Sequence, residues 1–190
     1  LLENDLNPEI PEGTEYYLPA GSSYRITPFE LAKGFRLVGS SEGVKPKVIL
    51  DDWWRIAEGS YITALEFENI EFSHTSNNKY FMNADKSFTI ESVSFVNCDF
   101  IGLTRGFWRH QQATSKHIMS FAVEGCRFDK CGWQTGSYGL MDLRSFNDPT
   151  AYDQVDKAVF RNCTFSRDND GTTGFGWGNL FNAPYIDKPI

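Results

Sequence analysis

Two aspartates and two arginines are the candidate residues for acid–base chemistry on an anionic ligand: Asp85, Arg109, Asp142 and Arg144. Two carboxylates can act as general acid and general base, whereas an arginine normally clamps a carboxylate. A lysine is the better base, and Lys86 and Lys116 are the candidates for that role. The residue types therefore fit proton abstraction beside a carboxylate, or hydrolysis between two carboxylic acids.

Aromatic and amide side chains accompany these charges and point to a second kind of chemistry, the binding of sugars. An aromatic ring can cover the apolar face of a sugar while polar groups bind its hydroxyls. The candidate binding residues are Asn83, Trp108, Arg109, Trp133, Asp142, Arg144 and Trp177. The alternative is that these rings pack under loops. The segment Asp51–Trp54 has two possible interpretations, a loop that acts as a lid or a hydrophobic plug.

The histidines and cysteines predict no metal centre. The three histidines are far apart, and the cysteine spacings match no zinc pattern. Three cysteines, Cys98, Cys126 and Cys163, occupy the same position in successive copies of an internal repeat, which is described below. In another copy of the repeat, Ile70 occupies that position. We therefore predict buried, free, structural thiols.

The elements that must position these residues follow from an internal repeat. Four segments share the same frame of apolar residues around a central Asn or Gly: Ala64–Phe72, Ser92–Phe100, Ser120–Phe128 and Lys157–Phe165. The closing phenylalanines are 28, 28 and 37 residues apart. A period of this size is typical of a solenoid. A shorter strand then closes each coil, and these strands are predicted at residues 80–84, 106–110, 139–143 and 179–182.

Alternation within the repeat predicts strands with one buried face. Sixteen positions, four in each copy, are apolar and alternate with mostly polar neighbours. The apolar face continues through the central Asn or Gly, so the chain must bend there, and these residues tolerate the left-handed conformation best. In the closing strands the same parity turns Asn83, Asp85, Arg109 and Asp142 outward.

This pattern predicts an all-β fold, a right-handed parallel β-helix of about five coils. A single domain spans residues 1–190: residues 1–33 form a lead-in segment and cap with a helical turn near residues 29–33, residues 34–182 form the coils, and residues 183–190 form a tail. The tail cannot complete a coil, so we expect a further domain or segment to cover the C-terminal end of a longer chain.

The repeat frame, preceded by LPAGSSYRI and FRLVGSSEGVKPKVIL, resembles the pectate-lyase-like β-helix superfamily, and more narrowly the uncharacterised β-helix domains of gut-bacterial glycan-utilisation proteins. The resemblance covers roughly residues 14–182 and implies that ligands bind on the outward face of the closing strands. It also implies a secreted or cell-surface bacterial protein whose signal segment lies outside this chain.

The resemblance leaves three functions open. The first is a non-catalytic module that binds an acidic polysaccharide or oligosaccharide. The second is an enzyme, either a calcium-assisted lyase acting on uronic acids or an inverting hydrolase, with Asp85 and Asp142 roughly 9.6 Å apart at ~4.8 Å per coil. The third is a structural or adhesive scaffold. No cofactor is predicted, except calcium if the chain is a lyase.

The composition of the chain limits the classes of partner that it is expected to bind. The net charge is −7, which disfavours a nucleic-acid partner because phosphate binding needs a basic face. The chain has no run of ~18 apolar residues, so we expect no membrane-spanning segment. The expected partner is therefore a glycan.

Overall fold

The computed structural model describes residues 11–27, 30–76, 80–112, 114–132, 140–143, 153–166 and 181–182. Within these ranges every regular element is a β-strand, and every strand pairing is parallel. The predicted all-β class and the parallel pairing are confirmed. The strand order is consistent with a parallel β-solenoid.

The first sheet and the second sheet run the length of the described stack. The first sheet contains β1 (Thr14–Leu18), β4 (Phe35–Gly39), β7 (Ser60–Glu68), β10 (Phe88–Val96), β13 (Lys116–Glu124), β16 (Asp153–Val155) and β17 (Ala158–Arg161). The second sheet contains β2 (Ser23–Ile26), β5 (Lys47–Leu50), β8 (Glu71–His74), β11 (Asp99–Ile101), β14 (Arg127–Asp129) and β18 (Thr164–Ser166).

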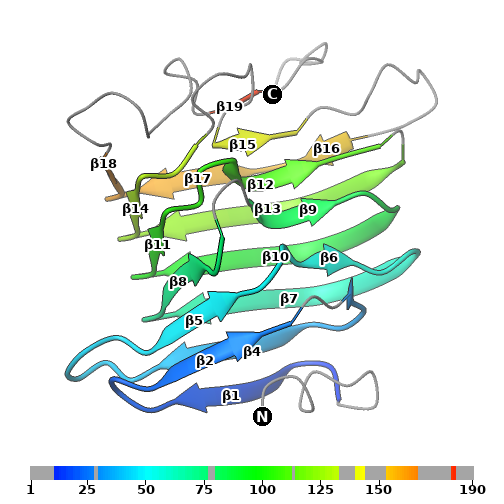
Figure 1. Ribbon diagram of the computed structural model, residues 1–190. Helices are drawn as coiled ribbons and strands as arrows, with labels where there is room; N and C mark the ends of the chain where they lie inside the picture. The colour runs from blue at the N-terminus through cyan, green and yellow to red at the C-terminus, as the bar shows by residue number, and fades with distance from the viewer. Residues whose placement is uncertain are drawn as a thin grey trace.

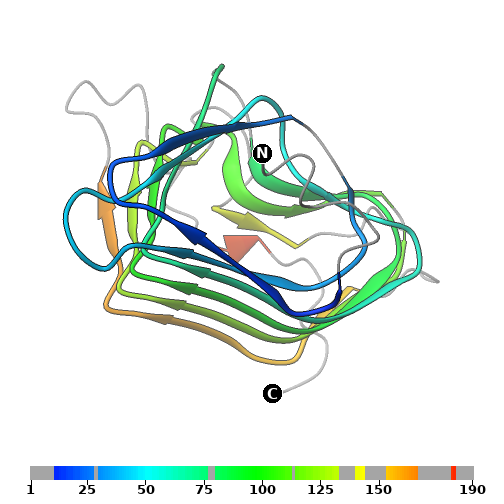
Figure 2. The same cartoon turned by 90° about the horizontal axis from the view of Figure 1, so that it is seen from below.

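The third group of strands closes each coil. We call β9 (Tyr80–Ala84), β12 (Gly106–His110), β15 (Met141–Asp142) and β19 (Phe181–Asn182) the closing sheet. A two-stranded sheet of β3 (Glu30–Leu31) and β6 (Arg55–Ile56) precedes it along the stack. Figure 1 shows the strands stacked from β1 upward, and Figure 2, seen from below, shows the coils superimposed around a shared interior. The bounds of β9 and β12 match the prediction, whereas β15 is shorter than predicted.

The register of the sheets reproduces the sequence repeat. Phe72, Phe100, Phe128 and Phe165 are successive partners in the second sheet. Their rings stack nearly parallel, with centroids 5.4, 4.9 and 5.2 Å apart. The 28-residue spacing therefore corresponds to one coil, and the 37-residue spacing is one coil with a longer excursion.

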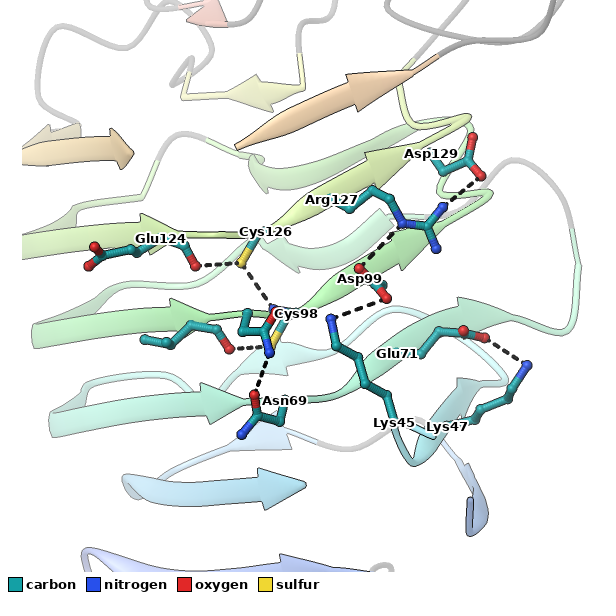
Figure 3. Close-up of polar contacts among 12 residues, drawn as sticks. Lys45, Lys47, Asn69, Glu71, Cys98, Asp99, Glu124, Cys126, Arg127 and Asp129 are labelled. Carbon is teal, nitrogen blue, oxygen red and sulfur yellow. Dashed lines mark hydrogen bonds and ion pairs between the residues drawn. The ribbon is translucent and has the colours of Figure 1, made fainter. Parts of the chain in front are cut away.

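The bend between the first and second sheets is made by one residue, as predicted. Asn69, Asn97, Gly125 and Asn162 have φ angles of 56°, 50°, 63° and 55°. Asn97 Nδ2 donates to Asn69 Oδ1 at 2.6 Å, so the amides also link neighbouring coils (Figure 3). Gly39 bends differently, because its φ is not positive. A Cβ there would lie 2.1 Å from the Asn69 carbonyl oxygen, so close packing requires the glycine.

The cysteines are free thiols in the positions predicted for them. Cys98 and Cys126 are buried beside each other, and the Cys98 N–H donates to Cys126 Sγ at 3.3 Å (Figure 3). Cys131 is also buried, and burial raises the pKa of its thiol to about 12. Cys163 is half-buried. These thiols serve as small apolar side chains in the core.

The core follows the predicted inward positions closely in three copies of the repeat and less closely in the fourth. The twelve inward residues of the first three copies are buried. In the fourth copy Ala158 is exposed, and Phe160, Cys163 and Phe165 are half-buried against the core. Apolar contact therefore holds β17 and β18 less strongly than it holds the strands before them.

The N-terminal part of the chain corrects one prediction. Glu30–Leu31 form β3, which pairs with β6, so a helical turn near residues 29–33 is wrong for the described residues. In addition, β1 and β2 pair in register with β4 and β5. The described strands of this segment therefore belong to the same sheets as the strands that follow, and the helical turn is replaced by a strand at residues 30–31. The alternating patterns of these short strands are typical of sheet residues.

Candidate functional site

Tyr80 is the centre of a cluster on the outward side of the closing sheet. Phe81 and Met82 both belong to the core cluster, so the strand bends between them. Tyr80 is not part of that core cluster, but its side chain is fully buried, with 1% of it exposed. The Trp53 ring lies edge-on to Tyr80, with centroids 6.2 Å apart. The guanidinium groups of Arg105 and Arg109 lie 5.5 and 5.4 Å from the Tyr80 ring centroid. A ring between two cations is stabilised by cation–π attraction.

The aromatic part of the cluster continues from Tyr80 to the preceding coil. Trp53 leaves β5 toward β6, and the Arg55 guanidinium lies 5.7 Å from the Trp53 ring centroid. Trp54, the next residue, packs into the core against Phe67 and Phe81 and bridges to Met82. The two tryptophans thus separate: Trp54 is the hydrophobic plug, and Trp53 belongs to the outward cluster.

Arg109 is held by a carboxylate from the next coil. Arg109 and Asp142 are register partners, and their side chains form an ion pair with Nε and Oδ2 3.6 Å apart. The side chains are only 7% and 2% exposed. A buried ion pair requires both members, since either charge alone would be desolvated without compensation.

Two amides lie beside this ion pair. Asn83 is the register partner of Arg109 on the other side, and its Nδ2 donates to Gln111 Oε1 at 2.8 Å. Asn83 is 4% exposed, whereas Gln111 is half-buried. The order Asn83, Arg109, Asp142 across three coils gives a row of amide, cation and carboxylate.

The predicted site residues divide into those that the structure brings together and those that it separates. Asn83, Arg109 and Asp142 face outward as expected and lie in one row. All three are buried, so the expectation of an exposed face is wrong for them. Trp108 is also wrong as a sugar-binding ring, because it is fully buried and packs edge-on against Phe121 in the core, with centroids 5.1 Å apart.

The remaining predicted residues are not in this row. Asp85 is half-buried at the end of β9, and its main-chain carbonyl accepts from Thr114 Oγ1 at 3.3 Å. Arg144, Trp133 and Trp177 lie outside the described residues. The predictions for these three residues stay predictions.

Sequence reasoning missed Tyr80, Trp53, Arg55 and Arg105 as members of the site. Tyr80 and Arg105 stand at or before the starts of β9 and β12, where alternation gives no information about direction. A usable signal was the aromatic or basic residue at or just before the starts of β9 and β12. That signal is short and irregular, unlike the 28-residue repeat.

The electrostatics of the cluster keep the phenol neutral. Burial raises the pKa of Tyr80, and the nearby guanidinium groups of Arg109 and Arg105 oppose this effect only in part. Three arginines and one aspartate make the cluster cationic on a chain of net charge −7. The arrangement can attract an anion and stack on a flat apolar surface.

The two lysines considered as bases are placed unfavourably. Lys86 Nζ contacts both Glu30 carboxylate oxygens at 2.7 Å, which raises the pKa of Lys86 and keeps it protonated. Lys116 and His110 point into the interior and are fully buried. A base must reach the proton it abstracts, and these side chains do not share a side with the outward cluster.

Comparisons with known proteins add no further assignment. The chain matches no protein-family model, no curated protein and no solved structure. No group of three or more His, Cys, Asp or Glu side chains arranged to hold a metal ion occurs among the described residues. No helix long and apolar enough to cross a membrane occurs in the ranges that the structure describes.

Proposed function

We propose that this chain is a right-handed parallel β-helix module of the pectate-lyase-like kind that binds an acidic polysaccharide or oligosaccharide. The right hand is the one that parallel strands joined by crossovers almost always take. The ligand would lie on the outward side of the closing sheet, over β9 and β12. A polymeric glycan ligand fits a secreted or cell-surface protein.

The observation that carries the proposal is the grouping of Arg55, Arg105 and Arg109 around the rings of Trp53 and Tyr80. Guanidinium groups bind carboxylates through paired N–H donors, and they do so better than lysines because the fork is planar. The half-buried Trp53 ring supplies an apolar platform for a sugar, and the half-buried Gln111 amide, which accepts from Asn83, can bind a hydroxyl.

The half-buried members of the cluster are the ones that would contact the ligand. Trp53, Arg55 and Arg105 are half-buried, whereas Arg109 and Asp142 are buried and paired with each other. Arg105 is therefore the proposed carboxylate-binding residue, and Trp53 is the proposed stacking residue. Arg109 and Asp142 are positioning residues that hold the Tyr80 ring from below.

Binding is favoured over catalysis by the state of the possible bases. Lys86 is held protonated by Glu30, and Lys116 is inside the stack. Arg109 already faces a carboxylate, which suits a cation that stays charged. A lyase needs an unprotonated base beside the sugar, and the outward cluster offers guanidinium groups and a neutral phenol instead.

Calorimetric titration with oligogalacturonate, and with the same oligomer after its carboxylates are reduced to alcohols, tests the proposal. We expect binding of the acidic oligomer only, and weaker binding as salt is raised, because the attraction is between charges. Arg105→Ala should weaken binding about tenfold or more, in line with the loss of a charge-assisted pair. The matched control is Arg161→Ala, since Arg161 is exposed on β17 in the first sheet.

Four outcomes would contradict the proposal. Equal binding of the acidic and reduced oligomers would remove the role of the arginines. An equal loss in the Arg105 and Arg161 variants would move the site elsewhere. Release of unsaturated, ultraviolet-absorbing products would identify a lyase, and absence of binding to a broad panel of acidic glycans would favour the scaffold.

A further inference from the structure

Lys116 and Asp153 place opposite charges at a core position of the first sheet. The residues that share this register position in successive coils are Ser60, Phe88, Lys116 and Asp153. The next inward position is filled by Ile62, Ile90, Ile118 and Val155, so the row points into the stack. A charge is tolerated at such a position only if a partner compensates it.

The Lys116 ammonium has two hydrogen-bond acceptors and one ion-pair partner. It donates to the main-chain carbonyls of Gln112 at 3.1 Å and Thr114 at 2.9 Å. Its third neighbour is Asp153 Oδ1, 3.6 Å away across the coils. The Lys116 side chain is fully buried, and that of Asp153 is 7% exposed. His110 Nδ1 also lies 3.6 Å from Asp153 Oδ1, from the closing-sheet side.

The turn between β12 and β13 is shaped around the same ammonium. Gln112 has a left-handed backbone, with φ of 69°, which strains a residue other than glycine. This conformation belongs to the turn whose Gln112 and Thr114 carbonyls accept from Lys116. The ammonium therefore stabilises a turn that would otherwise lose two partly buried hydrogen bonds.

The strand that supplies the counter-charge has few apolar contacts of its own. Of the inward positions of β16, Asp153 and Val155, only Val155 is apolar. Asp153 follows Lys116 by 37 residues, whereas Lys116 follows Phe88 by 28. The chain thus rejoins the stack after a longer excursion, and it does so at the residue that faces Lys116.

We infer that the buried Lys116–Asp153 ion pair is the anchor that docks β16 on β13 at the start of the last described coil. His110 lies beside this anchor, and the carbonyls of Gln112 and Thr114 accept from its ammonium. Because the pair is buried, a β16 strand displaced from this position leaves Lys116 charged and uncompensated. The pair therefore favours one docking position for β16. Val155, the one apolar inward residue of this strand, would favour that position only weakly by itself.

Hydrogen exchange of the full chain tests this inference, with the Asp156 amide as the reporter, since it donates to the Ile118 carbonyl at 2.9 Å across β16 and β13. Asp153→Asn should accelerate exchange of this amide by about tenfold or more, because removing one member of a buried pair strongly destabilises its surroundings. Amides of β10 should keep their rates.

Asp156→Asn is the matched control, because Asp156 is an exposed carboxylate of the same segment that pairs with His117 at the surface. In the Asp156→Asn variant, the exchange rates of the Gln154 and Val155 amides should change less than about twofold, as expected for the loss of a surface pair. These two residues are unchanged in both variants, so their amides can be compared directly. Equal acceleration in the Asp153 and Asp156 variants would overturn the inference.

A double-mutant cycle keeps the test valid if the single variants fold poorly. Lys116→Met combined with Asp153→Leu replaces the pair with apolar side chains of similar size, and we expect it to unfold at a higher temperature than either single variant. Additive losses in the double variant would show that the two side chains act separately, and the anchor would then be rejected.

Discussion

The outer faces of the second sheet and of the closing sheet carry charged side chains from the same coils but hold them differently. On the second sheet, Asp99 lies 3.2 Å from Lys45 and 3.4 Å from Arg127, and Arg127 also pairs with Asp129 (Figure 3). These side chains remain 17–43% exposed. On the closing sheet, Arg109 and Asp142 are nearly inaccessible.

The difference in exposure separates two kinds of charged group: surface ion pairs between neighbouring strands, and buried charges whose position depends on the surrounding structure. Alternating charges on neighbouring parallel strands neutralise each other at the surface and contribute little each. Guanidinium groups set against aromatic rings and half covered are costly to arrange and leave a cationic surface for an anion. The closing sheet is therefore where we place ligand binding, and the second sheet is scaffold.

The largest expected difference between the faces comes from removing one buried charge. Arg109→Met should lower the free energy of unfolding by about 3–5 kcal/mol, because the buried Asp142 carboxylate would lose its guanidinium counter-charge. Urea unfolding followed by fluorescence measures this. A loss within the range of a surface pair would show that Asp142 is solvated and that the two faces do not differ.

The next effect is a pH dependence from the inward side of the closing sheet. Burial, and then the charge of Lys116, lower the pKa of His110 to about 3. Below its ordinary value of about 6.5 the unfolded chain takes up a proton that the folded chain does not, so stability falls as pH falls from 6.5 toward 3. The slope from this residue approaches about 1.4 kcal/mol per pH unit.

His110→Phe should remove that slope, since a ring in this place can keep the edge-on contact with Phe88. Unfolding at pH 7 and pH 5 compares the two proteins, and the stability gap between them should change by about 2 kcal/mol. Asp153 is the carboxylate that faces His110. The control is His117→Phe, measured at the same two pH values, because His117 pairs with a carboxylate at the surface. Parallel pH profiles for the original chain and the His110 variant would contradict the assignment.

A smaller effect is expected at the corner that leads into the second sheet. Asn97→Ala should cost about 1–2 kcal/mol, because alanine must take the left-handed conformation and the link to Asn69 is lost. Asn97→Gly removes the link but not the conformational freedom, so it should cost less. Thermal unfolding separates the two, and an equal loss in both variants would show that the hydrogen bond alone matters.

The smallest effect is expected on the second-sheet face itself. Arg127→Ala should change stability by at most about 1 kcal/mol, and high salt should reduce that difference further. Unfolding in low and high salt measures both. A loss as large as that of Arg109→Met would erase the distinction between the faces.

The repeat was sufficient to predict the strands, because each inward position alternates with a polar neighbour and recurs at a fixed spacing. The corner residues Asn69, Asn97 and Asn162 were predictable for the same reason, since few residue types accept a left-handed backbone. Trp108 was misassigned on its residue type, since the parity that turns Arg109 outward already turns Trp108 inward. Parity from one short strand could not locate the bend that also turns Phe107 into the core.

By itself, the sequence determined the alternation, the period, the one-residue corners and the stacked thiols, since all of these are local patterns repeated in register. Only the tertiary structure decided that Arg105 and Arg109 both contact the Tyr80 ring. The same is true of Trp53 and Trp54, of which only Trp54 packs into the core, and of the buried ion pair between Lys116 and Asp153. The physical reason is that these contacts join different coils through side chains whose direction depends on bends and turns, which no period encodes.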